Sequence, residues 1–266
     1  MEGMATLRAL AGASMLLAGA LLAGCSTPSN SGPGWTTQPD GPATTAAPTA
    51  PESAAAGAGA TPGATGSPTS GPVATASAWK TFSDPAKTVS FELPQEWIAQ
   101  AVAPEEGTLP GALRVEVKKP DGTFVAALRT GLPPSSADCP QEARRPYTVI
   151  SSVPAELTAE GGEGTIPPRV VFRVIQGYRY FGSYGVTNLV GGADGQACEL
   201  RNIIRGPAGR GDYSFGDLVA VRAFAPDEKV APAKAFDTLD QAAKYAGGSS
   251  DFANVQRMLM SLEIKN

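Results

Sequence analysis

Alternation of apolar and polar positions predicts a succession of β-strands from residue 79 onward. In the stretch 88–93, Val89, Phe91 and Leu93 fall on one side of the chain, which is the pattern of a half-buried strand, and Pro94 ends it. Further strands are expected over residues 79–82, 147–153, 170–175, 178–189, 197–204 and 217–224.

One pair of strands is predicted to form a hairpin. The segments 112–119 and 123–130 both alternate, and Asp121-Gly122 lies between them. A dipeptide of this type favours the tight turn that joins two antiparallel strands. The chain from 79 to 224 therefore indicates a mainly antiparallel sheet.

The hydrophobic period changes near the C-terminus and predicts two helices. The first is expected to begin at an Asp237 cap, run through Ala246 and close at Gly247-Gly248. The second is expected to begin at an Asp251 cap and to present one apolar face, formed by Phe252, Val255, Met258 and Leu259. Residues 261–264 then predict a short last strand. A mainly antiparallel β-sheet with a few helices packed on it is an α+β fold.

Composition divides the chain into three parts. Residues 26–77 consist mostly of Ser, Thr, Ala, Gly and Pro, so ordering them would cost conformational entropy that no buried surface offsets. The sequence predicts a signal peptide over 1–24, a disordered tether over 25–77 and a single globular domain over 78–266. About 190 residues are enough to bury one hydrophobic core.

The N-terminal part resembles the signal of a bacterial lipoprotein. Arg8 precedes an apolar run over 9–22 that is too short to span a bilayer, and Leu22-Ala23-Gly24-Cys25 resembles a lipobox. This resemblance implies cleavage before Cys25 and a thioether from its sulfur to diacylglycerol, with a fatty acyl chain such as palmitate. Because stable anchoring takes two lipid chains, the resemblance implies a domain held at the extracytoplasmic face of the cell membrane.

The chain has three cysteines, and lipidation of Cys25 would leave two. In an oxidising compartment, Cys139 and Cys198 are expected to form a disulfide bond, which on the chain-entropy account stabilises the fold by about 4 kcal/mol. The alternative is a pair of buried free thiols.

Two segments at the ends of the predicted domain carry a family resemblance. Phe91-Glu92-Leu93-Pro94-Gln95-Glu96-Trp97, together with a terminal helix that runs into a Ser-Leu strand over 255–264, is similar to the Mog1/PsbP-like lipoproteins of actinobacteria. The resemblance implies a fold and no catalytic residue. The segment 133–168, which is expected to be long and irregular, departs from the fold of that family. Trp97 is interpreted as an aromatic plug of the core, with ligand stacking as the alternative.

The chain contains no histidine, which narrows the chemistry that it can carry out. Ser-His-Asp and Cys-His catalysis and the HExxH zinc site all require an imidazole. No phosphate-binding or EF-hand pattern is present, so we expect no cofactor, no metal site and no enzymatic activity. Paired carboxylates that hydrolyse envelope carbohydrate remain an alternative, because such carboxylates need only meet in space.

Two groups of residues are predicted as candidate binding surfaces. Tyr178, Tyr180 and Tyr184 share parity along one predicted strand and would form an aromatic row, either packed in the core or exposed to a ligand. Arg201 and Arg205 share parity with Glu199, opposite Leu200, Asn202 and Ile204. They would form either a solvated face or a patch for an anionic partner.

Net charge argues against a nucleic-acid partner. The formal charge of the chain is −4, and about −2 remains for the predicted domain once Asp40 and Glu52 of the tether are set aside. The expected function is a lipid-anchored, non-enzymatic domain that binds an unknown envelope protein or ligand. A structural or accessory role in the envelope is a further alternative.

Overall fold

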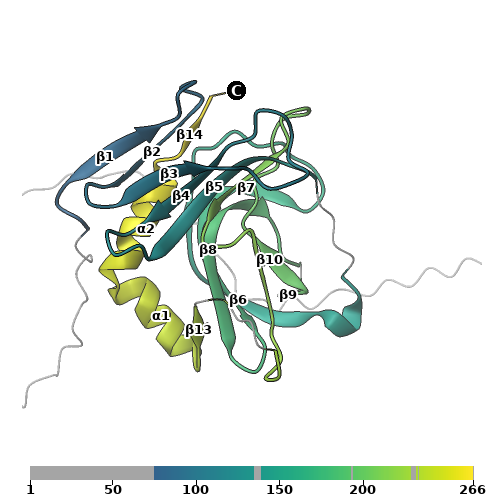
Figure 1. The fold of residues 1–266 in the computed structure, drawn as a ribbon. Helices are drawn as coiled ribbons and strands as arrows, with labels where there is room; N and C mark the ends of the chain where they lie inside the picture. Colours follow the sequence, from purple (N-terminus) through teal and green to yellow (C-terminus); the bar gives the residue numbers. More distant parts are fainter. Residues whose placement is uncertain (1–74, 135–138, 193, 229–231, 233, 266) are drawn as a thin grey trace, which may run out of the picture. The chain divides into compact units, whose positions relative to one another are not determined.

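The computed structural model describes residues 75–134, 139–192, 194–228, 232 and 234–265 (Figure 1). The predicted signal peptide, Cys25 and almost all of the predicted tether lie outside these residues. Within the described ranges every strand pairing is antiparallel, which confirms the α+β prediction. The elements are β1 (Trp79–Ser83), β2 (Val89–Pro94), β3 (Ile98–Val102), β4 (Arg114–Lys118), β5 (Phe124–Leu132), η1 (Gln141–Ala143), β6 (Arg145–Pro154), β7 (Thr165–Gln176), β8 (Tyr180–Leu189), β9 (Gln196–Ala197), β10 (Glu199–Arg201), β11 (Asp212–Gly216), β12 (Ala220–Arg222), β13 (Ala235–Phe236), α1 (Leu239–Gly248), α2 (Ser250–Met260) and β14 (Glu263–Ile264).

The main sheet has the strand order β3-β4-β5-β11-β8-β7-β6-β9, and β13 also pairs with β8. Its central strand β8 lies between the helices and β10, and it is buried from Phe181 to Asn188 (Figure 1). A strand covered on both faces contains a continuous run of buried residues, because neither set of alternating side chains meets water. The hairpin of β4 and β5 forms where the sequence predicted it, and Gly122 in its turn has a φ of 84°.

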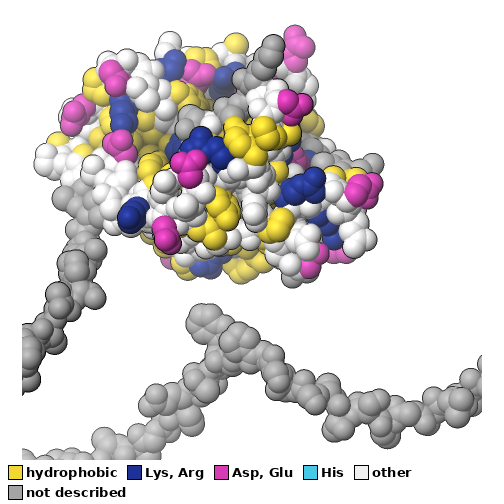
Figure 2. Space-filling model, turned by 90° about the horizontal axis from the view of Figure 1, so that it is seen from below, with side chains coloured by type: hydrophobic (Ala, Val, Ile, Leu, Met, Phe, Trp, Pro, Cys, Tyr) yellow, Lys and Arg dark blue, Asp and Glu magenta, His cyan; other side chains and the backbone are white. Residues whose placement is uncertain are grey.

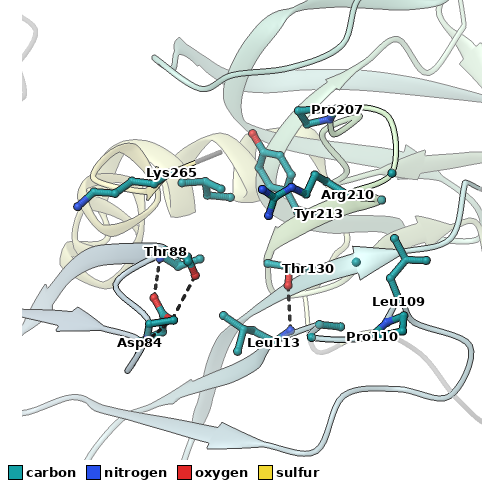
Figure 3. Close-up of a pocket in the computed structure, with 18 residues that line it drawn as sticks. Asp84, Thr88, Leu109, Pro110, Leu113, Thr130, Pro207, Arg210, Tyr213 and Lys265 are labelled. Atoms are coloured by element: carbon teal, nitrogen blue, oxygen red, sulfur yellow. Dashed lines mark hydrogen bonds between the residues drawn. The ribbon is translucent and has the colours of Figure 1, made fainter.

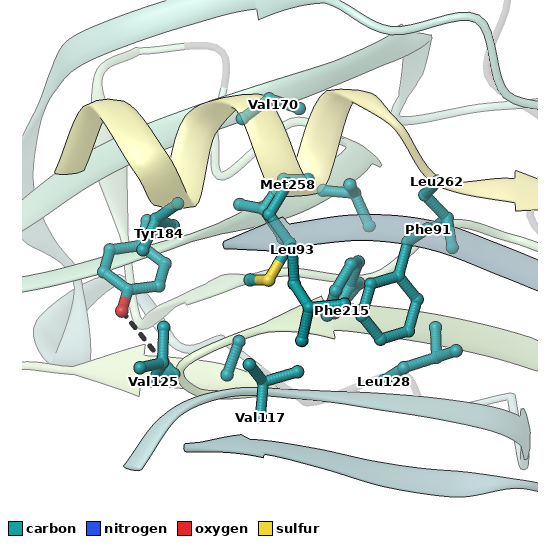
Figure 4. Close-up of a cluster of buried hydrophobic side chains, with 14 of the residues drawn as sticks. Phe91, Leu93, Val117, Val125, Leu128, Val170, Tyr184, Phe215, Met258 and Leu262 are labelled. Carbon is teal, nitrogen blue, oxygen red and sulfur yellow. Dashed lines mark hydrogen bonds between the residues drawn. The ribbon is translucent and has the colours of Figure 1, made fainter. Parts of the chain in front are cut away.

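One face of the main sheet packs against α1 and α2. Phe252, Val255, Met258 and Leu259 are all buried in this layer, as the helical pattern predicted. Figure 4 shows α2 above the sheet, with Met258 beside Leu93 and the hydroxyl of Tyr184 directed at Val125.

The helices begin at different caps from those predicted. Thr238 caps α1 and Ser249 caps α2, each by accepting a hydrogen bond from a backbone N–H of the first turn. Asp237 precedes the first cap by one residue, and Asp251 already lies in the first turn of α2. Both types of residue accept the same hydrogen bond, so local sequence alone does not choose between neighbours.

A separate small sheet joins the two ends of the described chain. Its order is β1-β2-β14, and Ile264 of the short last strand lies opposite Val89. Trp97 follows β2 and is buried in the main core, which agrees with its interpretation as a core residue.

The opposite face of the main sheet is covered by the β10–β12 pair and contains a buried polar cluster. Ile175, Phe181, Leu200 and Val221 form an apolar group there. Beside it, the Asn202 side-chain amide donates hydrogen bonds to Ser183 Oγ at 2.7 Å and to two backbone carbonyls, at 2.9 and 3.2 Å.

Several predicted strands are shorter or interrupted. The expected strand over 197–204 is divided into β9, β10 and an isolated bridge at Ile204, and the one over 217–224 is reduced to β12. Strands β3 and β11 were not predicted. The segment 133–168, expected to be irregular, contains η1, β6 and the start of β7.

Candidate ligand pocket

The predicted disulfide bond is confirmed. Cys139 and Cys198 are joined with their Cα atoms 5.6 Å apart, and the bridge ties the segment before β6 to the segment between β9 and β10. The alternative of two free thiols is wrong. The predicted lipidation of Cys25 falls outside the described residues.

The three tyrosines do not form a single aromatic row. Tyr178 precedes β8, is 49% exposed and packs its ring on Phe181 of the apolar group under β10–β12. Tyr180 and Tyr184 belong to the helix-covered side, where Tyr184 is buried. The row was predicted from strand parity, which holds for Tyr180 and Tyr184 but not for Tyr178, because Tyr178 lies in the bend before β8.

The alternation predicted around β10 holds from Glu199 to Asn202 and then breaks, because β10 ends at Arg201 and Ile203 and Ile204 are both buried. Leu200, Asn202 and Ile204 are buried, whereas Arg205 is exposed and Arg201 is half-buried. Arg201 forms an ion pair with Glu199, so its charge is compensated on its own strand. Binding of an anionic partner by this patch stays a prediction.

A pocket of about 270 Å³ lies where five segments from distant parts of the chain meet (Figure 3). Its lining comes from the β1–β2 turn, the end of β14, the turn before β4, the end of β5 and the connection into β11. The lining residues are Asp84, Ala86, Thr88, Val89, Leu109, Pro110, Gly111, Ala112, Leu113, Thr130, Gly131, Pro207, Gly209, Arg210, Gly211, Tyr213, Ile264 and Lys265.

Asp84 organises the wall formed by the β1–β2 turn. Its buried carboxylate accepts hydrogen bonds from the backbone N–H groups of Val89, at 2.6 Å, and Ala86, at 3.0 Å, and from the Thr88 hydroxyl at 3.2 Å. Burial opposes ionisation of the carboxyl group, but these hydrogen bonds outweigh it and hold the pKa of Asp84 below its usual value of 3.8. Asp84 is therefore an ionised structural anchor at neutral pH.

Two β-turns form the neighbouring walls. In one, the Ala112 N–H donates to the Leu109 carbonyl; in the other, the Arg210 N–H donates to the Pro207 carbonyl. The third residue of each turn is a glycine with positive φ, 80° at Gly111 and 81° at Gly209, as a type II turn requires. Hydrogen bonds thus fix the backbone of both walls.

The turn that carries Arg210 is pressed closely against the end of β5. Gly211 has a φ of 70°, and a Cβ atom there would lie 2.8 Å from the Leu132 carbonyl oxygen. Only glycine combines this φ with so close an approach of two backbones. The sequence therefore holds Arg210 at a fixed place on the pocket rim.

The charged side chains of the lining are Arg210, Lys265 and Asp84. Figure 3 shows the guanidinium of Arg210 directed toward the side formed by Thr88 and Lys265, while the ammonium of Lys265 points outward. Within the described part of the chain, no carboxylate forms an ion pair with Arg210 or Lys265. By contrast, basic and acidic side chains are interspersed on the face drawn in Figure 2.

A second cluster of polar residues lies under β10–β12. Asp217 is buried and accepts hydrogen bonds from Ser183 Oγ at 2.5 Å and from the Tyr184 N–H, and it pairs with Lys234 at 2.9 Å. Burial raises the pKa of Asp217, against the opposing effect of Lys234. Ser183 is 1% exposed, so the cluster joins structural layers and does not present a nucleophile to solvent.

The described residues contain no group of three or more Cys, Asp or Glu side chains arranged to hold a metal ion. None of the helices in these ranges is both long and apolar enough to cross a membrane. No protein-family model, no curated protein and no solved structure matches the chain.

Sequence reasoning missed the residues that form the pocket. Arg210 was visible in the turn-forming run Gly206-Pro207-Ala208-Gly209-Arg210-Gly211, whose glycines and proline indicate a tight loop. Asp84 carried a further signal, because an aspartate that opens a turn can accept hydrogen bonds from its own backbone. Neither signal shows that the two loops meet.

Proposed function

We propose that this protein is a lipid-anchored lipoprotein of the cell envelope whose extracytoplasmic domain binds a ligand or partner without catalysing a reaction. The observation that carries the binding role is the preformed pocket, whose walls are fixed by hydrogen bonds and whose rim holds Arg210. A concave site lined by apolar groups and a few placed polar ones is the usual form of a small-molecule site.

The protonation states of the lining favour binding over proton transfer. A general acid or base works best with a pKa near the operating pH, whereas the pKa of Asp84 is held below 3.8. Arg210 supplies a guanidinium, which donates hydrogen bonds and has no acceptor. These groups orient a ligand by charge and hydrogen bonding.

The membrane anchor and the family membership belong to the same proposal. The lipobox-like Leu22-Ala23-Gly24-Cys25 supports lipidation, and the disulfide Cys139–Cys198 fits an oxidising, extracytoplasmic compartment. The segments 91–97 and 255–264 support membership of the Mog1/PsbP-like lipoproteins. In this arrangement the predicted tether would carry the pocket away from the bilayer surface.

Intact-mass spectrometry of the purified protein tests the anchor. The wild-type chain is expected to begin at Cys25, to carry the mass of a diacylglyceryl group and to enter the detergent phase of a phase-separation assay. A Cys25→Ser variant is expected to lack that mass and to stay in the aqueous phase. If wild-type Cys25 proves unmodified, or if both forms partition alike, the proposed anchoring is wrong.

Crosslinking in intact cells tests the binding role. The anchored protein is compared with an Arg210→Gln form, and every species captured by both is discarded as unrelated to the pocket. Capture that depends on Arg210 supports the proposal. Identical capture by the two forms contradicts a binding role for this pocket.

A further inference from the structure

The pocket has an excess of one positive charge. Arg210 and Lys265 contribute two positive charges, and the ionised Asp84 contributes one negative charge. Three hydrogen-bond donors of the protein already engage the Asp84 carboxylate, whereas Arg210 is exposed and has no carboxylate partner among the described residues. The charge available to a ligand is therefore that of Arg210, with Lys265 at the outer rim.

Much of the remaining lining is apolar. Val89 and Ile264 are paired across β2 and β14, and Leu109, Pro110 and Leu113 come from the turn before β4. Leu109 is 38% exposed although it is a large apolar residue. The volume of about 270 Å³ is slightly below the roughly 300–1,000 Å³ typical of sites for drug-sized ligands. The pocket thus fits a small molecule with an apolar portion.

The form of the cation restricts the ligand further. A guanidinium presents parallel N–H groups that match the two oxygens of a carboxylate or phosphate. A carboxylate carries one negative charge and so neutralises the excess in the pocket, whereas a phosphate monoester carries about −1.5 to −2 at neutral pH and would exceed it. The charge balance therefore favours the carboxylate.

On these grounds we infer that the pocket binds a small carboxylic acid with an apolar stem, its carboxylate paired with Arg210 and its stem against Leu109, Leu113 and Ile264. This inference rests on the proposed binding function and names the ligand class of that site. The fixed turn places the backbone of Arg210 on the pocket rim before the ligand arrives, so that binding orders its side chain and not the loop.

Calorimetric titration with octanoate tests the inference. The protein is the chain 25–266 carrying Cys25→Ser, exported behind a conventional secretory signal so that the disulfide forms. Octanamide serves as the uncharged probe of the same shape, and octyl phosphate as the probe with the other acidic group. The variant is Arg210→Gln, and its matched control is Arg145→Gln, which removes an exposed arginine of β6 outside the pocket.

Octanoate is expected to bind the wild type saturably at low ionic strength. The dissociation constant of octanamide for the wild type, and that of octanoate for Arg210→Gln, are each expected to be at least about tenfold higher, because each change removes a charge-assisted pair. Octyl phosphate is expected to bind more weakly than octanoate. Arg145→Gln is expected to bind octanoate as the wild type does, and equal melting temperatures of the two variants would show that both are folded.

Four results would overturn the inference. Equal affinity for octanoate and octanamide, or unchanged octanoate binding by Arg210→Gln, would show that the pocket does not recognise the charge, while leaving its role in binding intact. Tighter binding of octyl phosphate than of octanoate would show that the pocket prefers a phosphate to a carboxylate. Failure of octanoate to bind would refute the ligand class, and the Cys25 and crosslinking experiments would still decide the proposed function separately.

Discussion

Replacement of Asp84 by alanine is expected to destabilise the protein and to loosen one wall of the pocket. The substitution removes the acceptor for the N–H groups of Val89 and Ala86 and for the Thr88 hydroxyl. The backbone hydrogen bond from the Asp84 N–H to the Val89 carbonyl, at 3.1 Å, stays in place. The turn should therefore persist without its internal anchor.

The size of the effect follows from the number of donors left without an acceptor. A hydrogen bond to a charged group contributes about 1.5–3 kcal/mol, and water can replace part of the loss for the two less buried donors. We therefore expect Asp84→Ala to lower the free energy of unfolding by about 2–3 kcal/mol. In a domain of this size that corresponds to a fall in melting temperature of about 5–10 °C.

The difference between wild type and Asp84→Ala is expected to depend on pH. The pKa of Asp84 in the folded protein lies below its usual value of 3.8, so the ionised form is stabilised by folding. This contribution is fully present above the pKa of the unfolded chain and is lost as pH falls through the lower folded value. The gap should stay constant between about pH 5 and 7 and narrow below about pH 3.8.

Urea denaturation of both proteins, followed by circular dichroism at a series of pH values, measures this gap. Asp121→Ala is the matched control, because Asp121 is exposed and accepts its turn hydrogen bonds from Thr123. Its effect should be much smaller than that of Asp84→Ala. A loss below about 1 kcal/mol for Asp84→Ala, or a gap that does not change down to pH 2.5, would refute the account of Asp84 as an ionised anchor.

Two further predictions concern the disulfide and the core. Replacing Cys139 and Cys198 together by serine should lower the free energy of unfolding by about 4 kcal/mol, because the disulfide closes a long loop in the unfolded chain. Urea denaturation of the variant and the wild type under non-reducing conditions measures this loss. An unchanged denaturation midpoint would contradict the prediction. Tyr184→Phe should cost about 1 kcal/mol in the same assay, because the hydroxyl donates a buried hydrogen bond to the Val125 carbonyl at 2.8 Å. A variant as stable as wild type would show that this hydrogen bond contributes nothing net.

The local sequence pattern was sufficient to predict an element that has one exposed and one buried face, or a turn of distinctive residues. The hairpin of β4 and β5 followed from alternation around Asp121-Gly122, and the buried face of α2 followed from its helical spacing. Local pattern was insufficient for β11, because its residues from Tyr213 to Gly216 are all buried and so show no alternation. Neighbouring cap residues were indistinguishable for a different reason, because Asp, Ser and Thr accept the same hydrogen bond.

The pairing of Cys139 with Cys198 was predicted from the sequence, because lipidation of Cys25 would leave two cysteines, and the structure then excluded the alternative of two free thiols. The pocket needed the structure, because its lining joins residues 84–89, 109–113, 130–131, 207–213 and 264–265. Nothing in the local chemistry of any one segment indicates which others it will meet.

By itself, the sequence determined the class of fold and the absence of histidine, because short-range periodicity and composition express these properties directly, and it predicted the disulfide that the structure confirmed. Only the tertiary structure decided that Arg210 faces an apolar pocket whose wall is held by Asp84. Strand order in an antiparallel sheet brings together segments more than a hundred residues apart, and the energy that selects this order is spread over the whole core. A binding site made of such segments therefore appears only when the chain is folded.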